Sequence, residues 1–254
     1  MPLRAIVRLG WLCIVPLSCA APRELALPAP AKIFEVLTAP STAFPVDSSD
    51  LIAPFDAQWT WQLVDANGRA IKDPAIQTLA SSTALYGATW MVPMIDGDRE
   101  FLSQGKDDEI SLVAVEAPHD QAISYFTPPL ILAPSQMHLE ELFASSSSMR
   151  VDWMDGRGER DRGIGERTAR VVRGERIRTP LGEFETMRVE TKFEATLRFA
   201  KAQRTNTLWV AAGIGVIAEE WRGRVTVMGI PISNDVGTAV RISPITTTKR
   251  VSVP

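Results

Sequence analysis

The stretch that decides the fold runs from Thr179 to Val227 and reads TPLGEFETMRVETKFEATLRFAKAQRTNTLWVAAGIGVIAEEWRGRVTV. After an opening turn, its residues alternate strictly between two sides. One side carries Met187, Val189, Thr191, Phe193, Ala195, Leu197 and Phe199, and the other carries Arg188, Glu190, Lys192, Glu194, Thr196 and Arg198. A period of two with one charged face is typical of an antiparallel strand that has one face on a core and one in water. The pattern therefore predicts a buried Phe193 beside an exposed Glu194.

Proline and glycine positions predict the turns that bound this strand. Pro180 presets φ for the second position of a β-turn and Gly182 suits the fourth, so Phe184 would anchor the next hairpin to the core. Gly213 and Gly215 predict a sharp bend between two further strands. The expected order after the first strand is a turn at Lys201–Arg204, a strand at Thr205–Val210, the bend at Ala211–Gly215 and a strand at Val216–Trp221. The whole stretch is thus a predicted β-meander.

Shorter alternating runs predict strands on both sides of the meander. They are Ala57–Val64, Ala88–Ile95, Arg99–Ser103, Glu109–Val115, Ala122–Phe126, Met149–Asp155 and Ile230–Ile242. Thr127–Pro134 contains three prolines and is expected to cross between two halves of the sheet. Ser135–Phe143 is the one predicted helix, with Ser135 as its cap, and Ser145–Ser148 is a predicted loop.

Composition excludes several classes of protein. The chain has 254 residues, a formal net charge of −3 and 45% hydrophobic residues, which fits a globular protein and offers no basic surplus for nucleic acid. Its two cysteines, Cys13 and Cys19, both lie in the first twenty residues. A disulfide framework or a cysteine metal site in the remaining chain is therefore excluded.

The first twenty residues have the pattern of a secretory signal peptide. Arg4 and Arg8 precede the apolar run Leu9–Leu17, which is followed by small residues. The apolar run is far shorter than the roughly 20 residues that span a bilayer. Residues 1–20 are therefore the predicted signal peptide of an exported protein.

Two modes of cleavage are open. Leu17-Ser18-Cys19-Ala20 resembles the lipobox of bacterial lipoproteins, in which cleavage leaves a lipidated cysteine first; Pro16 departs from that pattern. The alternative is ordinary cleavage after Ala20. Five prolines between Ala21 and Asp50 predict an extended tether in which Ile33–Leu37 could form one docked strand. The expected organisation is a signal peptide (1–20), a proline-rich linker (21–50), a β domain (51–245) and a polar tail (246–254).

Three motifs together resemble an uncharacterised family of exported bacterial lipoproteins. They are Trp59-Thr60-Trp61 after a short leader, Thr179–Val189 with its Thr-Pro-x-Gly-x-Phe opening, and Trp209–Ile217 with the form Trp-x-x-x-Gly-x-Gly-x-Ile. The family is similar in architecture to periplasmic lipoprotein carriers, whose curved sheet surrounds acyl chains. The resemblance implies a mainly β fold, an antiparallel meander forming a curved sheet or half-open barrel with at most one or two short helices. It brings no catalytic residues.

Motifs for catalysis or metal binding are absent from the sequence. His119 and His138 are the only histidines and lack metal-ligand spacing, so exposed loop positions are expected for both. No nucleophile elbow or phosphate-binding loop occurs. Asp152, Asp155, Glu159 and Asp161 cluster in sequence without indicating that two of them share a substrate. We expect no enzyme activity, no metal and no cofactor.

Two other features have a structural and a functional interpretation. Eight arginines between Arg157 and Arg178 predict either cross-strand ion pairs, which we favour, or weak attraction to an anionic lipid or polysaccharide. Trp59 and Trp61 share one face of a predicted strand, where they either fill the core, which we favour, or contact an apolar ligand.

The sequence thus predicts an exported protein of a bacterial cell envelope, periplasmic or held at the membrane by a lipid on Cys19. We expect a non-catalytic structural or interaction role with an envelope protein as partner. The alternative is a carrier that binds an acyl chain or another apolar ligand on the concave face of the sheet, with Trp59 and Trp61 as contacts. No nucleic-acid partner is expected.

Overall fold

The structure is a computed structural model that describes residues 33–40, 42–52, 57–64, 75–78, 80–81, 85–93, 98–105, 107–243 and 246–247. Cys19 and the rest of the predicted signal peptide lie outside these residues. Short helical segments are α1 (Ser48–Leu51), η1 (Leu85–Gly87) and η2 (Pro118–Asp120). All other regular structure in the described residues is strand.

The strands follow one another along the chain with few interruptions. The first nine are β1 (Glu35–Pro40), β2 (Val46–Asp47), β3 (Ala57–Val64), β4 (Ala75–Thr78), β5 (Ala80–Ser81), β6 (Trp90–Pro93), β7 (Arg99–Gln104), β8 (Ile110–Ala117) and β9 (Ala122–Ala133). The remainder are β10 (Gln136–Met137), β11 (Leu142–Trp153), β12 (Glu159–Thr179), β13 (Gly182–Leu197), β14 (Ala200–Ala211), β15 (Gly215–Val227), β16 (Ile230–Arg241) and β17 (Thr246–Thr247).

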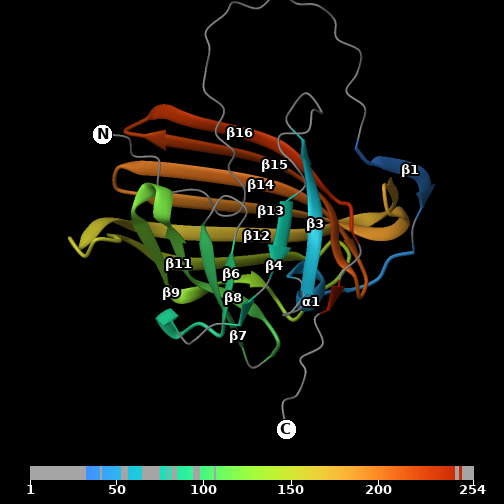
Figure 1. Cartoon of the computed structure of the whole chain (residues 1–254), viewed down its shortest axis with the longest axis horizontal. Helices are drawn as coiled ribbons and strands as arrows, with labels where there is room; N and C mark the ends of the chain where they lie inside the picture. Colours follow the sequence, from blue (N-terminus) through green and yellow to red (C-terminus); the bar gives the residue numbers. More distant parts are fainter. Residues whose placement is uncertain are drawn as a thin grey trace, which may run out of the picture.

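One antiparallel sheet contains fifteen of these strands. Its order is β17-β3-β16-β15-β14-β13-β12-β11-β9-β8-β7-β6-β5, with β1 paired to β12 and β4 paired to β3. In Figure 1 the long strands β12–β16 run across the view while β3 crosses in front of them. The two ends of the order, β17 and β5, do not pair with each other in the described part of the chain. The predicted curved, open antiparallel sheet is therefore confirmed.

The inner, concave face of this sheet holds most of the core. Directly opposed residues of antiparallel strands point to the same side of a sheet. Arg167 of β12 and Arg204 of β14 are both opposite Phe193 of β13, so all three side chains lie on the inner face. One apolar cluster joins residues from β3, β6–β9, β11 and β13–β16, and a second surrounds Met187 and Val189. The predicted buried position of Phe193 is confirmed.

The outer face carries a smaller cluster next to β1. Phe34 packs edge-to-face on Trp209, with ring centroids 4.7 Å apart, and Ile177 and Ile217 complete the contact. β1 pairs with the end of β12 through Glu35–Arg178 and the residues that follow. The predicted docked strand at Ile33–Leu37 therefore exists, and the sheet includes part of the segment assigned to the linker.

The bounds of the meander differ from the predicted ones at the first reversal and at the end of β15, which continues past Trp221 to Val227. Lys201–Arg204 is not a turn but part of β14, because the chain reverses earlier, at Arg198-Phe199. Phe199 consequently lies in the turn and is exposed, whereas the alternation placed it on the core side. The turns at Pro180-Leu181 and at Ala212–Ile214 are confirmed, and Phe184 packs against the outer cluster.

Three predicted elements between the strands of the first half are wrong. Thr127–Pro134 belongs largely to β9, and the predicted loop Ser145–Ser148 lies inside β11. The predicted helix Ser135–Phe143 is absent: Met137 is buried in β10, paired with Val46 of β2, while Leu139 and Leu142 are exposed. The apolar residues of this segment have a spacing typical of a helix, but they do not share one buried face.

Candidate functional site

Trp59 and Trp61 lie on the inner face of β3. Each is 4% exposed, and both belong to the large core cluster together with Trp90, Phe126 and Trp221. The strand positions them there because Leu63, two residues beyond Trp61, is opposite the inner residue Ala239 of β16. The structure therefore brings the two predicted contact residues together in the interior.

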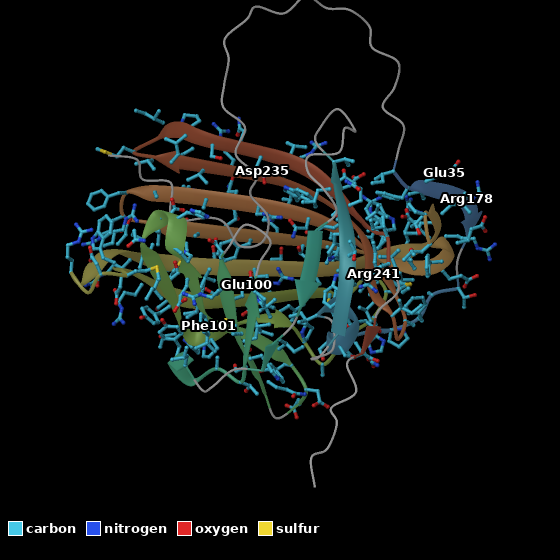
Figure 2. The ribbon with its side chains drawn as sticks, viewed as in Figure 1. Glu35, Glu100, Phe101, Arg178, Asp235 and Arg241 are labelled. Atoms are coloured by element: carbon cyan, nitrogen blue, oxygen red, sulfur yellow. The ribbon has the colours of Figure 1, made fainter. Side chains whose placement is uncertain are left out.

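Arg241 lies beside both of these tryptophans. It is opposite Trp61 in the pairing of β16 with β3, and its guanidinium carbon is 5.4 Å from the Trp59 ring centroid and 5.6 Å from that of Trp61. Figure 2 shows Arg241 next to β3. At 1% exposure it is the largest of the fully buried side chains, and burial lowers its pKa to about 10. The two ring faces near its guanidinium offset part of the cost of burying this charge.

The contacts of Arg241 continue into the turn before β15. Its Nη1 donates to the Ile214 carbonyl at 2.9 Å, and the neighbouring Gly213 amide donates to the Asp50 carboxylate at 2.8 Å. Burial raises the pKa of Asp50. Among the described residues, no acceptor bonds the Nε of Arg241 or the indole nitrogen of Trp59. This part of the inner face thus presents hydrogen-bond donors next to apolar rings.

A second polar group on the inner face is formed by residues of β12, β14 and β15. Arg204 is buried; its Nη2 lies 4.0 Å from Oε1 of Glu219, and its Nε donates to Asn206 at 3.0 Å. Burial raises the pKa of Glu219, an effect that Arg204 and Arg167 partly offset. Burial also lowers the pKa of the Arg167 guanidinium to about 10, and Arg167 donates to the Leu132 carbonyl at 2.9 Å.

The charged groups of the inner face are mainly hydrogen-bond donors. Of the described residues there with shifted pKa values, Asp50 and Glu219 are carboxylates that can transfer a proton, whereas Arg167 and Arg241 stay protonated at any ordinary pH. Guanidinium groups and indole N–H groups are donors that suit carboxylate or phosphate oxygens. In the residues that the structure describes, no group of three or more His, Cys, Asp or Glu side chains could hold a metal ion.

The outer cluster contains one buried carboxylate whose contacts are internal. Glu175 accepts from the indole nitrogen of Trp209 at 2.6 Å and from Nε of Arg173 at 2.5 Å. Thr186 donates to the Glu175 carbonyl at 2.8 Å. These bonds secure β12 to β13 and β14 beneath β1, so the group is structural.

The other residues considered from sequence are dispersed. His119 and His138 are exposed in separate segments, as expected. The arginines of β12 are largely ion-paired, for example Arg176 with Glu185 at 2.8 Å and Arg178 with both Glu35 and Glu183 (Figure 2). Asp161 is buried and accepts from the Arg162 amide at 2.8 Å, which fixes a strand end.

Sequence reasoning missed Arg241, Arg204 and Glu219. The alternation of β16 does indicate the position of Arg241, because Arg241 lies two residues after the inner residue Ala239 and so points to the same face. Recognising it requires knowing that β16 pairs with β3, and a strand that follows a meander gives no local indication of such a distant partner.

No protein-family model matches the chain, and no curated protein matches it. Within the described residues, no helix is long and apolar enough to cross a membrane. A solved structure of a "putative lipoprotein" from Parabacteroides distasonis is similar to 77% of this chain and 97% of its own, at a TM-score of 0.35 and 10% identity.

Proposed function

We propose that this chain is an exported bacterial envelope protein, anchored by a lipid on Cys19, that acts by binding rather than by catalysis. The observation that carries the proposal is Leu17-Ser18-Cys19-Ala20, placed after two arginines and a short apolar run and before a proline-rich segment. Acyl chains contribute about 0.8 kcal/mol per buried CH₂ group, and several chains make a durable anchor. β1 would then receive the tether at one end of the sheet.

The anchor is tested by mass spectrometry and fractionation of the full chain expressed in a bacterial host. The wild type should begin at an acylated Cys19 and remain in the membrane fraction. Cys19→Ala should abolish acylation, whereas Cys13→Ala, the matched control, should keep it. A wild-type protein that begins at an unmodified Ala21 would refute the anchor.

A second candidate function is that of a carrier for an apolar ligand with an anionic head. Arg241 beside Trp59 and Trp61 favours it, because a buried cation next to aromatic rings suits the carboxylate of a fatty acid. The apolar inner cluster would contact the acyl chain.

Titration with oleate, followed by tryptophan fluorescence and calorimetry, tests the carrier. Binding should shift the fluorescence and show a negative ΔCp. Trp59→Ala and Arg241→Met should weaken it, whereas Arg222→Met, exposed on the outer face, should not. Absence of both heat and a spectral change would eliminate this candidate and leave the anchored interaction protein.

A further inference from the structure

At the end of the sheet opposite β1, two neighbouring hairpins expose three large apolar side chains. Phe199 lies in the turn between β13 and β14 and is 52% exposed, Met228 lies in the turn between β15 and β16 and is 81% exposed, and Ile230 begins β16 at 66%. The Met228 amide donates to the Phe199 carbonyl at 2.8 Å, so the two turns are neighbours. We call Phe199, Met228 and Ile230 the hairpin patch; Figure 1 shows these turns at the end away from β1.

The backbone at Met228 makes this patch unusual. Met228 has φ of 50° and Gly229 has φ of 80°, and the two residues connect the paired residues Val227 and Ile230. Such a two-residue hairpin turn favours Asn, Asp or Gly at its first position, because Gly has no Cβ and the short polar side chains of Asn and Asp tolerate positive φ, which strains other side chains. An exposed methionine there gains nothing from the fold. A strained backbone conformation at an exposed apolar residue, with no benefit to the fold, indicates that the Met228 side chain contacts another molecule.

The patch is surrounded by a surplus of positive charge. The two hairpins that carry it, residues 196–201 and 224–234, contain three Arg or Lys residues and no Asp or Glu, although the whole chain carries −3. Arg162 and Arg198 share Glu159, at 2.7 and 3.2 Å. Lys201 and Arg224 form no ion pair within the described part of the chain.

We propose that the hairpin patch docks on an anionic lipid bilayer. Phe199, Met228 and Ile230 enter the interface between head groups and acyl chains, and the cations beside them contact the head groups. Charge complementarity selects this occupant over a second copy of the chain, because two copies would bring positive surpluses together.

The docking does not depend on the lipid on Cys19. β1 and the hairpin patch lie at opposite ends of the long strands (Figure 1). The tether of roughly 14 residues from Cys19 to Ile33 reaches at most about 50 Å, which is close to the length of β13 at about 3.3 Å per residue. A chain attached at both points of one membrane would therefore lie along it.

Vesicle co-sedimentation tests the proposal with the chain from Ala21 onward, which lacks the signal segment and any acyl group but contains every described strand. Vesicles of phosphatidylcholine with 30% phosphatidylglycerol should bind it, vesicles of phosphatidylcholine alone should bind it weakly, and added salt should reduce binding. Phe199→Ser combined with Met228→Asn should weaken binding about tenfold or more, because two apolar side chains leave the interface.

Stability separates this effect from a folding defect. Met228→Asn suits the positive φ, so it should keep or raise Tm while it lowers binding. Leu142→Ser, which removes an equally exposed apolar side chain at the far end of β11, should leave binding unchanged. Absence of binding to the anionic vesicles, or equal binding by the Phe199→Ser/Met228→Asn variant, would overturn the proposal, and neither result would bear on acylation of Cys19.

Discussion

Glu219 shows how a single buried charge affects this fold. Burial raises its pKa, so the folded protein takes up a proton at a higher pH than the unfolded chain. Between the unfolded and the folded pKa the folded state binds more protons, and the free energy of unfolding therefore rises as pH falls through that interval. Glu219→Gln should remove this contribution. Measured by urea denaturation from pH 8 downward, the wild type should gain stability relative to Glu219→Gln as pH falls.

The control for Glu219 is its neighbour. Glu220 is exposed on the opposite side of β15, so Glu220→Gln should not reproduce the pH-dependent difference. A constant difference between the wild type and Glu219→Gln over the same interval would show that Arg204 and Arg167 fully compensate the buried carboxylate.

Phe193 and Glu194 test the register of the meander residue by residue. Phe193 is 5% exposed in the main cluster, whereas Glu194 faces outward, where it is half-buried rather than fully exposed as predicted and pairs with Lys192 at 2.8 Å. Phe193→Ala should lower the free energy of unfolding by about 3–5 kcal/mol, because it empties a core position. Glu194→Ala should lower it by about 0.5 kcal/mol, as ion pairs near the surface contribute little. Similar losses in chemical denaturation would contradict the register.

At the scale of the element, the pairing of β15 with β16 depends on a glycine. Gly237 is opposite Trp221, and a Cβ at Gly237 would clash with the Trp221 ring. Gly237→Ala should displace the ring and its bond to Asp235, with a loss of about 1–3 kcal/mol and a changed tryptophan fluorescence spectrum. Gly223→Ala on the same strand pair meets its first neighbour at 3.8 Å and should be tolerated.

Alternation predicted the strands of the meander, but it failed where polar side chains form unusual backbone contacts. The serine run of β11 looked like a loop, yet the Ser145 hydroxyl accepts from the Ile131 amide at 3.0 Å and the Ser147 hydroxyl donates to the Pro128 carbonyl. Pro128 and Pro129 have no amide proton to offer, so side chains complete the contact between β11 and β9. Such long-range compensation cannot be deduced from local pattern.

The candidate site was predicted only in its apolar half. The period of two placed Trp59 and Trp61 on one face, and they are buried together. Arg241 joins them through the pairing of β16 with β3, which are separated by most of the chain. Periodicity predicts which face of a strand a side chain lies on, but not which strand is its neighbour. A site formed by two strands that are distant in sequence therefore could not be predicted.

For the molecule as a whole, the sheet order predicts where stability is concentrated. β14 has hydrogen-bonded neighbours on both sides along nearly its whole length and β13 has them from Met187 to Thr196, and both contribute to the core clusters. β1 pairs with one strand through four residues, and β6 is itself four residues long. Opening either of these releases few contacts, whereas opening β13 disrupts the sheet.

Hydrogen exchange measured by mass spectrometry should therefore show a gradient across the sheet. Amides in residues 188–196 and 202–210 should exchange slowest, at the rate of global unfolding, and those in residues 35–37 and 90–93 should exchange much faster through local opening. Phe34→Ala should accelerate exchange in β1 further, because Phe34 holds it against Trp209, while exchange in β13 stays unchanged. Equal protection of β1 and β13 would mean that the sheet opens as a single unit, and the outer cluster would then stabilise the entire domain rather than the strand that leads to the proposed anchor.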